Sequence, residues 1–325
     1  MTKTFLEEHR KEIFKKYDTE TLIRDVTRFK NGQGMLSKTL CHFFKERIYE
    51  CYNVRGRMSP IEAMQNDEVM KTIIDYINTK PKFYDRDLVT NVESFFRNGG
   101  KIATKVGNFD PRNARWLYER YNPHKQSLNI LDTSAGFGAR MLTALLTGNS
   151  YYGIDPNQKL NQNLNECLSF LRDNDVIADS QKCKLFCQGS EKFIPELVNT
   201  CDMMFTSPPY FNLETYSKDT CASTKNYNDY NGWLSEFVEP TIDNIIKYMK
   251  VGGVIMINIK NLTRNKRNPL FDDWKRIMES KDSLKYVETL EINHQAKKYY
   301  TKSCNYNVEQ YKGFKEPVMV FRKVK

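Results

Sequence analysis

Hydrophobic positions in the first hundred residues recur at helical spacing. Ser59-Pro60-Ile61-Glu62 has the residues of a capping box with proline in the first turn, and Met64, Ile73, Ile74 and Ile77 follow it. Residues 36–52 and 87–96 predict further helices, the second ending at Asn98-Gly99-Gly100. No strand pattern precedes residue 101. We therefore expect residues 1–100 to form a helical N-terminal region.

From residue 128 the pattern changes to short apolar runs that alternate with helices. Strands are expected at 128–131, 151–154, 184–187, 202–205 and 254–259, with helices at 140–146, around Leu160 to Leu171, and at 233–250. Such alternation predicts a parallel sheet covered by helices on both faces. Two closing strands, 286–292 and 318–322, have no long helix between them and should be antiparallel. Residues 101–325 are thus expected to form a doubly wound, Rossmann-like α/β domain.

Length, composition and charge limit the class of protein and the partners that fit this sequence. The chain has 325 residues, enough for one catalytic domain with a smaller appendage. No apolar run approaches the roughly 18 residues of a membrane helix, and the first residues lack a signal-peptide core. We expect a cytoplasmic protein, or one in the host cytoplasm or nucleus if it is viral. The eight cysteines and four histidines show no zinc spacing, so reduced thiols and no metal site are expected. The net charge of +10 favours a polyanionic partner.

A glycine-rich turn follows the first predicted strand. It runs Asp132-Thr133-Ser134-Ala135-Gly136-Phe137-Gly138 and opens a helix, so that main-chain N–H groups can approach a ligand closely. The next strand ends in Asp155-Pro156, which places an acid where ribose hydroxyls need an acceptor. There is no G-x-G-x-x-G pattern. The pattern therefore suits a nucleoside without a pyrophosphate better than NAD.

The strand at 202–205 leads directly into Ser207-Pro208-Pro209-Tyr210. Ligands sit at this carboxyl edge of an open α/β sheet. Two successive prolines fix two φ angles, so the loop can hold the Ser207 side chain and the Pro208 carbonyl towards one cleft. Such acceptors would orient an amine with its lone pair facing an electrophile. The ring of Tyr210 offers a face on which a base can stack.

These motifs together resemble those of the amino-methyltransferases of DNA, which carry a D/N/S-P-P-Y/F/W catalytic loop. The resemblance covers about residues 101–325 and implies a class I methyltransferase fold. It also implies that the cofactor is S-adenosylmethionine and that the partner is double-stranded DNA. It implies that Ser207, Pro208, Pro209 and Tyr210 are catalytic. The residues that it assigns to the cofactor are Asp132, Ser134, Ala135, Gly136, Gly138, Asp155, Pro156, Gly189 and Ser190. A segment that packs on the methionine moiety in the family corresponds here to Asn108-Phe109-Asp110-Pro111.

Motif order bears on DNA recognition. Too few residues separate Gly189 from Ser207 to hold a recognition domain, so recognition must come from residues 1–100, 212–232 or 294–316. Two segments combine basic residues with polar or aromatic ones, as suits a nucleic-acid backbone. The candidate DNA-binding residues in them are Lys260, Arg264, Lys266, Arg267, Lys297 and Lys298.

Several functions remain open at this stage. Serine at the first position of the catalytic loop leans towards N4 of cytosine in the family, whereas aspartate or asparagine is usual for N6 of adenine. An RNA or protein-glutamine methyltransferase carries a related loop, more often with asparagine first. A non-catalytic subunit that binds nucleic acid is a further alternative. The oligomeric state is left open.

Overall fold

The computed structural model describes residues 3–53, 57–80, 86–97, 102–211, 214–215, 227, 229–261, 268–293 and 315–325. The described part of the N-terminal region is mainly helical, as expected. Its helices are α1 (Phe5–Ile13), α2 (Thr19–Lys30), α3 (Ser37–Glu50), α4 (Pro60–Met64), α5 (Asp67–Asn78) and α6 (Leu88–Arg97).

The capping box at Ser59 and Glu62 is present and begins α4. The helix expected to continue from it ends early, because the Asn66 side chain accepts from the Val69 N–H and begins α5 instead. The expectation of no strand before residue 101 is wrong in one place. The short β1 (Tyr52–Asn53) pairs antiparallel with β6 (Glu214–Thr215).

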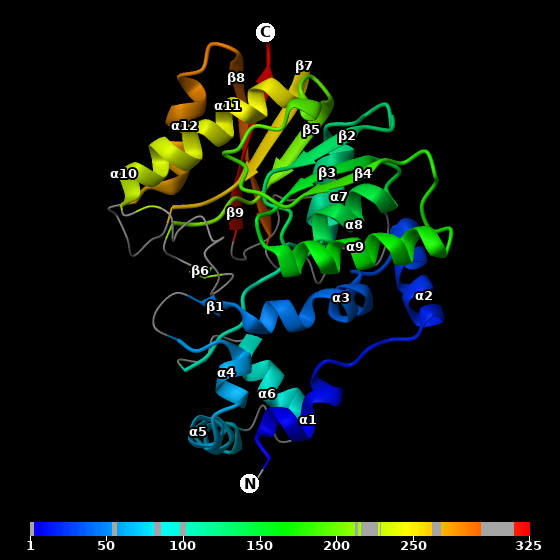
Figure 1. Ribbon diagram of the computed structural model, residues 1–325, viewed down its shortest axis with the longest axis vertical. Helices are drawn as coiled ribbons and strands as arrows, with labels where there is room; N and C mark the ends of the chain where they lie inside the picture. The colour runs from blue at the N-terminus through cyan, green and yellow to red at the C-terminus, as the bar shows by residue number, and fades with distance from the viewer. Residues whose placement is uncertain are drawn as a thin grey trace.

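The main sheet has seven strands in the order β4-β3-β2-β5-β7-β9-β8 (Figure 1). The strands β2 to β7 in this sheet are parallel, and β9 runs antiparallel between β7 and β8. This topology confirms the expected Rossmann-like, doubly wound fold with an antiparallel closing strand. The bounds are β2 (Asn129–Asp132), β3 (Ser150–Ile154), β4 (Cys183–Phe186), β5 (Cys201–Thr206), β7 (Met249–Asn258), β8 (Leu284–Asn293) and β9 (Lys315–Lys323).

Helices cover both faces of this sheet because successive strand residues alternate between two cores. Ile130 and Met203 face a core that includes α7 (Pro111–Arg120), α8 (Ala139–Leu146) and α9 (Gln158–Asp173). Their neighbours Leu131 and Met204 face a second core, which includes α11 (Glu239–Tyr248) and α12 (Leu270–Glu279). The strand ends are thereby held between two packed layers.

The single helix expected at 233–250 is interrupted. It consists of α10 (Tyr230–Trp233), a π-helical turn (Leu234–Val238) and α11, and residues 249–250 already belong to β7. Pro240 has no N–H to donate to the Glu236 carbonyl, which explains the widened turn. That carbonyl accepts a long hydrogen bond of 3.5 Å from the Tyr227 hydroxyl instead. The helix α12, between β7 and β8, was not among the expected elements.

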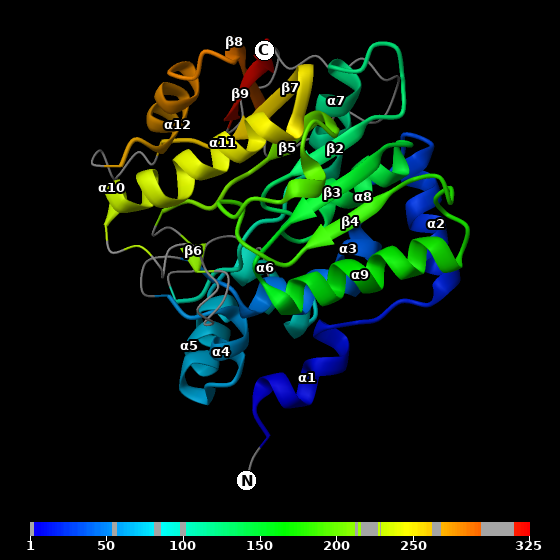
Figure 2. The same ribbon diagram turned by 45° about the horizontal axis from the view of Figure 1, so that its top comes forward.

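The N-terminal helices lie at one end of the molecule, below the sheet in Figure 1, and Figure 2 shows the same arrangement after rotation. They share one continuous hydrophobic core with α7, α8 and α9, which includes Phe44 of α3 and Phe96 of α6. None of the helices in the described part of the chain is long and apolar enough to cross a membrane.

Candidate active site

The predicted motifs meet at one edge of the sheet. The strands β2, β3, β5 and β7 are parallel, so their carboxyl ends lie side by side. Asp132 ends β2, Asp155 follows β3, Ser207 follows β5 and Asn258 ends β7. Of these, Asn258 was not singled out in the sequence. The edge therefore combines the glycine-rich turn with the Ser207-Pro208-Pro209-Tyr210 loop.

The Asp132 carboxylate is fully buried and holds the turn to its neighbours. It forms an ion pair with Arg140 of α8 at 2.7 Å, and it accepts hydrogen bonds from Tyr151 of β3 and Thr206 of β5, both 2.8 Å long. The Ser134 N–H donates to it at 3.1 Å. The carboxylate is thus engaged by four partners, and its geometry is that of a positioning residue. Arg140, Tyr151 and Thr206 were missed because nothing in the sequence links them to Asp132.

Glycine is required in the turn at two positions. Gly136 and Gly138 have φ values of +56° and +73°, in the left-handed region. A Cβ at Gly138 would lie 2.5 Å from the ring of Phe44, which comes from α3 of the N-terminal region. The N-terminal helices therefore buttress the turn directly. Asn108 also holds the turn, because its side chain donates to the Phe137 carbonyl at 3.1 Å.

Phe109 packs against β5 and against Arg140 of α8. Its ring packs edge-on against Phe205 with the centroids 5.1 Å apart, and the Arg140 guanidinium lies 5.8 Å from its centroid. The next residue, Asp110, caps α7 through the Arg112 N–H and forms an ion pair with the Arg112 side chain. The structure thus brings the expected 108–111 segment into contact with both the turn and β5.

The Asp155 carboxylate faces the turn from β3. One oxygen accepts the Gly136 N–H and the other accepts the Asn157 N–H, both at 3.0 Å. Burial raises the pKa of this carboxyl to about 6, since these two hydrogen bonds offset only part of the desolvation of the charge. Each oxygen keeps one further acceptor position. Two such positions on one carboxylate match the two adjacent hydroxyls of a ribose.

Two more observations bear on a bound nucleoside. The Thr133 hydroxyl is buried in the turn and has no hydrogen-bond partner in the described part of the protein. Beyond β4, Ser190 is buried and fixed, with its hydroxyl 3.0 Å from that of Thr241 and its carbonyl accepting from Asn244. Gly189 lies in the loop after β4, next to Ser190, and Pro156 lies in the loop after β3, next to Asp155. The residues present therefore fit a nucleoside cofactor that carries no pyrophosphate.

The Ser207-Pro208-Pro209-Tyr210 loop is held from β7. The Ser207 hydroxyl donates to the Asn258 carbonyl at 3.2 Å. The Tyr210 hydroxyl accepts the Lys260 N–H at 3.1 Å, which fixes the far end of the loop. Pro208 is buried, whereas Ser207 and Tyr210 remain partly exposed. The loop is therefore anchored at both ends, with its polar groups at the surface of the edge.

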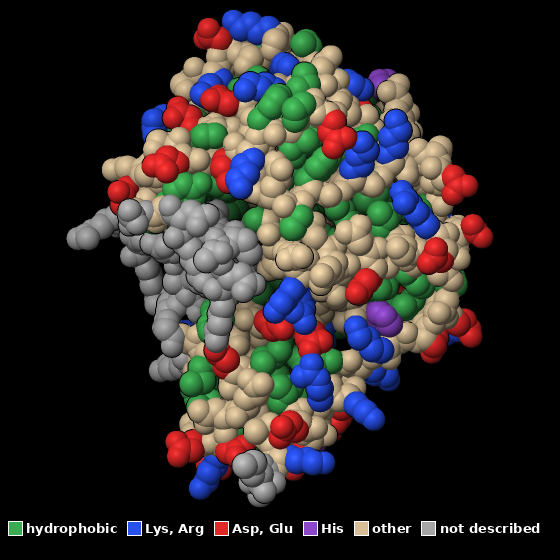
Figure 3. All heavy atoms as spheres, in the orientation of Figure 1, with side chains coloured by type: hydrophobic (Ala, Val, Ile, Leu, Met, Phe, Trp, Pro, Cys, Tyr) green, Lys and Arg blue, Asp and Glu red, His purple; other side chains and the backbone are tan. Residues whose placement is uncertain are grey.

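The basic residues expected to bind DNA are only partly placed. The Lys260 ammonium forms an ion pair with Glu316 at 2.9 Å and so already has an anionic partner. Arg264, Lys266, Arg267, Lys297 and Lys298 lie outside the described residues. Over the described part of the face in Figure 3, positive and negative side chains are interspersed. Within the described ranges, no three His, Cys, Asp or Glu side chains lie close enough to hold a metal ion.

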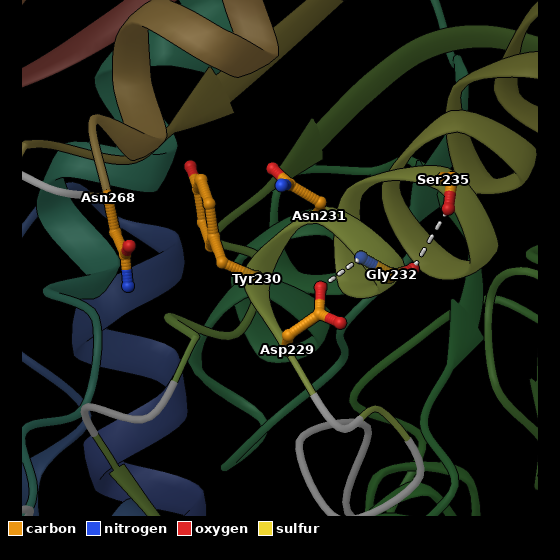
Figure 4. Close-up of a pocket in the computed structure, with 6 residues that line it drawn as sticks. All are labelled: Asp229, Tyr230, Asn231, Gly232, Ser235 and Asn268. Atoms are coloured by element: carbon orange, nitrogen blue, oxygen red, sulfur yellow. Dashed lines mark hydrogen bonds between the residues drawn. The ribbon is translucent and has the colours of Figure 1, made fainter.

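A shallow pocket lies between the beginning of α10 and Asn268, which precedes α12 (Figure 4). Its volume is about 650 Å³. Tyr230 connects it to the Ser207-Pro208-Pro209-Tyr210 loop, because its ring packs against Phe211, the next residue, with the centroids 5.4 Å apart. The residues that line the pocket are Asp229, Tyr230, Asn231, Gly232, Ser235 and Asn268. Four of them belong to the 212–232 segment in which recognition was one of the expectations.

Comparison with known proteins agrees with the motif at β5. Residues 201–325 match the N6_N4_Mtase family model, described as DNA methylase, which confirms the resemblance over the segment that contains Ser207 to Tyr210. No curated protein matches the chain.

Three of the solved structures that resemble this chain illustrate the range of the similarity. TrmN from Thermus thermophilus is 14% identical with a TM-score of 0.42, over 67% of this chain and 50% of its own. This chain thus spans half the length of TrmN. The N-methyltransferase NodS from Bradyrhizobium japonicum is 12% identical with a TM-score of 0.43, over 66% and 96%. The tRNA (m1A58) methyltransferase TrmI from Aquifex aeolicus is 11% identical with a TM-score of 0.41, over 68% and 71%.

Proposed function

Because residues 201–325 match the DNA methylase family, we propose that this protein is an S-adenosylmethionine-dependent methyltransferase of the exocyclic amino group of a base in DNA. The observation that carries this proposal is the position of Ser207. Its hydroxyl lies at the carboxyl end of β5, one residue after Thr206, which is bonded to the Asp132 of the glycine-rich turn. A cofactor in the turn and an amine at Ser207 would therefore meet at one edge.

The cofactor would lie across the ends of β2, β3 and β4. Asp155 would accept the ribose hydroxyls, and the main chain of Ser134, Ala135, Gly136 and Gly138 would line the methionine end together with Phe109. Gly189 and Ser190 would lie near the adenine, and Pro156 beside it. Asp132 would act by holding this turn in place through Arg140 and Thr206. S-adenosylmethionine, when bound, supplies the methyl group from its sulfonium.

The catalytic loop would bind and orient the target. The amine would donate one N–H to Ser207 Oγ and one to the Pro208 carbonyl, which turns its lone pair towards the cofactor. Pro209 keeps the loop rigid, and Tyr210 would stack on the base, offsetting part of the roughly few kcal/mol needed to take the base out of a duplex. The nitrogen becomes acidic once methylated, so its proton can leave without a dedicated base.

Cytosine N4 is the favoured target, since serine occupies the first position of the loop, and adenine N6 is the alternative. Both bases present the same N–H₂ group to the same acceptors. We propose that the DNA binds along the carboxyl edge of the sheet in the catalytic domain of residues 101–325, with the helical region of residues 1–100 beside it. Candidate contacts are Arg264, Lys266, Arg267, Lys297 and Lys298, with Lys260 available if Glu316 releases it.

The test is transfer of a labelled methyl group from S-adenosylmethionine to duplex DNA, with the modified nucleoside identified by mass spectrometry. We expect N4-methylcytosine from the wild-type protein and loss of transfer by Ser207→Ala with the cofactor affinity retained. Ser169→Ala, an exposed position on α9, is the matched control and should keep full activity. Single-stranded RNA serves as the competing substrate. Preferential transfer to RNA, or undiminished turnover by Ser207→Ala, would refute the proposal.

A further inference from the structure

Asn258 closes β7 beside the catalytic serine. Its side chain is buried, 2% exposed, and it lies in register with Val318 of β9. The Ser207 hydroxyl is 3.2 Å from the Asn258 carbonyl oxygen and 3.5 Å from the side-chain oxygen Oδ1. Both of these atoms can only accept a hydrogen bond. The proton of the Ser207 hydroxyl is therefore directed towards Asn258.

The orientation of the Asn258 amide is fixed from the other side. Its Nδ2 donates to the Pro317 carbonyl of β9 at 3.0 Å. A flipped amide would put its oxygen against that carbonyl, so Oδ1 must face Ser207. No described residue donates a hydrogen bond to Ser207 Oγ, and its lone pairs are left pointing away from Asn258.

We propose that Asn258 is a positioning residue that holds Ser207 as a hydrogen-bond acceptor and so makes the site selective for a base with an amino group. This inference rests on the function proposed above. A hydroxyl held in this way can accept from the N–H₂ of cytosine or adenine. It cannot donate to the keto oxygen that uracil, thymine or hypoxanthine carries at the same place. An amide does not take up a proton at neutral pH, so Asn258 acts through orientation alone.

The selectivity can be measured by binding, apart from turnover. The probes are two duplexes that contain the sequence methylated in an expressing host, with the target base opposite an abasic site. One carries cytosine and the other uracil; for an adenine target they carry adenine and hypoxanthine. Fluorescence anisotropy with saturating S-adenosylhomocysteine gives the ratio of the two affinities. We expect the wild-type protein to favour the amino base and Asn258→Ala to lose about threefold of this preference. The main-chain carbonyl of residue 258 remains an acceptor in that variant, but Oδ1 and the bond from Nδ2 to the Pro317 carbonyl are lost, so the Ser207 hydroxyl is held by one acceptor in place of two.

Asn129→Ala is the matched control. Asn129 also donates from a strand to a main-chain carbonyl, that of Thr200 at 3.0 Å, but it begins β2 at the opposite edge of the sheet. It should keep the wild-type preference. A preference unchanged in Asn258→Ala would overturn the inference and leave Asn258 a structural residue. Absence of methyl transfer by the wild-type protein is a different result, which overturns the proposed function itself.

Asn258→Asp gives a second measurement that does not depend on the alanine variant folding. In its protonated form the carboxyl can donate to the Pro317 carbonyl in place of Nδ2, while its other oxygen still accepts from Ser207. The preference for the amino base should therefore be retained by this variant at a pH where the carboxyl is protonated. A preference in Asn258→Asp that falls under these conditions to the level of Asn258→Ala would contradict the proposed role.

Discussion

The Thr206 hydroxyl donates a hydrogen bond of 2.8 Å to the buried carboxylate of Asp132. This contact joins the last residue of β5 to the last residue of β2, next to Ser207 on one side and to the glycine-rich turn on the other. Both partners are 0% exposed. A displacement of either strand end is therefore transmitted to the other, and the distance between the two halves of the site depends on this pair.

Replacing Thr206 by valine should reduce both stability and turnover. Valine keeps the shape but removes the donor, which leaves the Asp132 carboxylate with one partner fewer in a buried place. The cost should be about 1–3 kcal/mol in the free energy of unfolding, measured by urea denaturation. Thr200→Val, just before the other end of β5, removes only partly exposed hydrogen bonds of 3.2–3.3 Å and should cost under about 1 kcal/mol. An equal loss in the free energy of unfolding for the two variants would show that the hydrogen bond to Asp132 contributes no more than an exposed one.

Stability and cofactor affinity should depend on pH in opposite directions through Asp155. The pKa of this carboxyl is raised to about 6 in the folded protein, so the unfolded chain loses its proton first as the pH rises. The free energy of unfolding should therefore fall between about pH 4 and pH 6.5, by roughly 2–3 kcal/mol from this group. Affinity for S-adenosylmethionine should rise over the same interval, because the ionised carboxylate is the better acceptor for ribose hydroxyls.

Asp155→Asn isolates this contribution. The variant should flatten the pH dependence of unfolding relative to the wild-type protein and weaken cofactor binding by about 1–3 kcal/mol at pH 7.5 in calorimetry. Asp173→Asn, an exposed carboxyl at the end of α9, serves as the control for loss of a charge. An affinity for the cofactor that stays constant from pH 5 to pH 8 would remove Asp155 from the binding site.

Alanine at Gly138 should be more harmful than alanine at Gly148. Both glycines have a positive φ, +73° and +83°, so both substitutions strain the backbone by about 1 kcal/mol. Only at Gly138 does a Cβ meet the ring of Phe44, whereas nothing lies within 4 Å at Gly148. Gly138→Ala should therefore cost a further ~1–3 kcal/mol in thermal unfolding and weaken cofactor binding. If the two variants melt at the same temperature, the turn accommodates the added atom by moving away from α3.

Arg264→Ala, Lys266→Ala and Arg267→Ala combined should weaken DNA binding for all sequences. The slope of log K against the logarithm of the salt concentration should become shallower by about 0.9 for each phosphate that is no longer neutralised. The matched control is alanine at Lys125, Lys182 and Lys285, three exposed lysines at the amino ends of β2, β4 and β8, across the sheet. Anisotropy of labelled duplex against salt concentration measures both triple variants. Superimposable curves for the two would assign DNA binding to another surface, with Lys297 and Lys298 next to be tested.

The sheet could be predicted from the sequence because each strand is a short apolar run between polar turns, as in residues 151–154. The π-helical turn could not, since it arises from Pro240 within an otherwise regular helical pattern, whose apolar spacing the turn hardly changes. The two-residue strand β1 was missed for another reason. It exists through pairing with β6, far along the chain, and has no apolar alternation of its own.

The residues of the candidate site likewise fall into those that a local motif predicts and those that only the fold reveals. Gly136, Asp155 and Ser207 stand in local motifs whose spacing is visible in one dimension. Arg140, Thr206 and Asn258 matter only through partners that the fold brings to them from other strands. Polar residues at strand ends are common, and only the parallel pairing of β2, β5 and β7 shows which of them meet.

The close approach of Phe44 to Gly138 limits how this protein can be altered. A recognition module that is attached only by a linker can be exchanged between relatives without disturbing catalysis. Here the N-terminal helices form one wall of the hydrophobic core on which the glycine-rich turn rests, and β1 pairs with a strand just beyond the catalytic loop. Removing the N-terminal helices would expose apolar surface and would at the same time loosen the glycine-rich turn. Grafting a new specificity onto this scaffold would therefore have to proceed through surface loops, with the helices retained as a foundation.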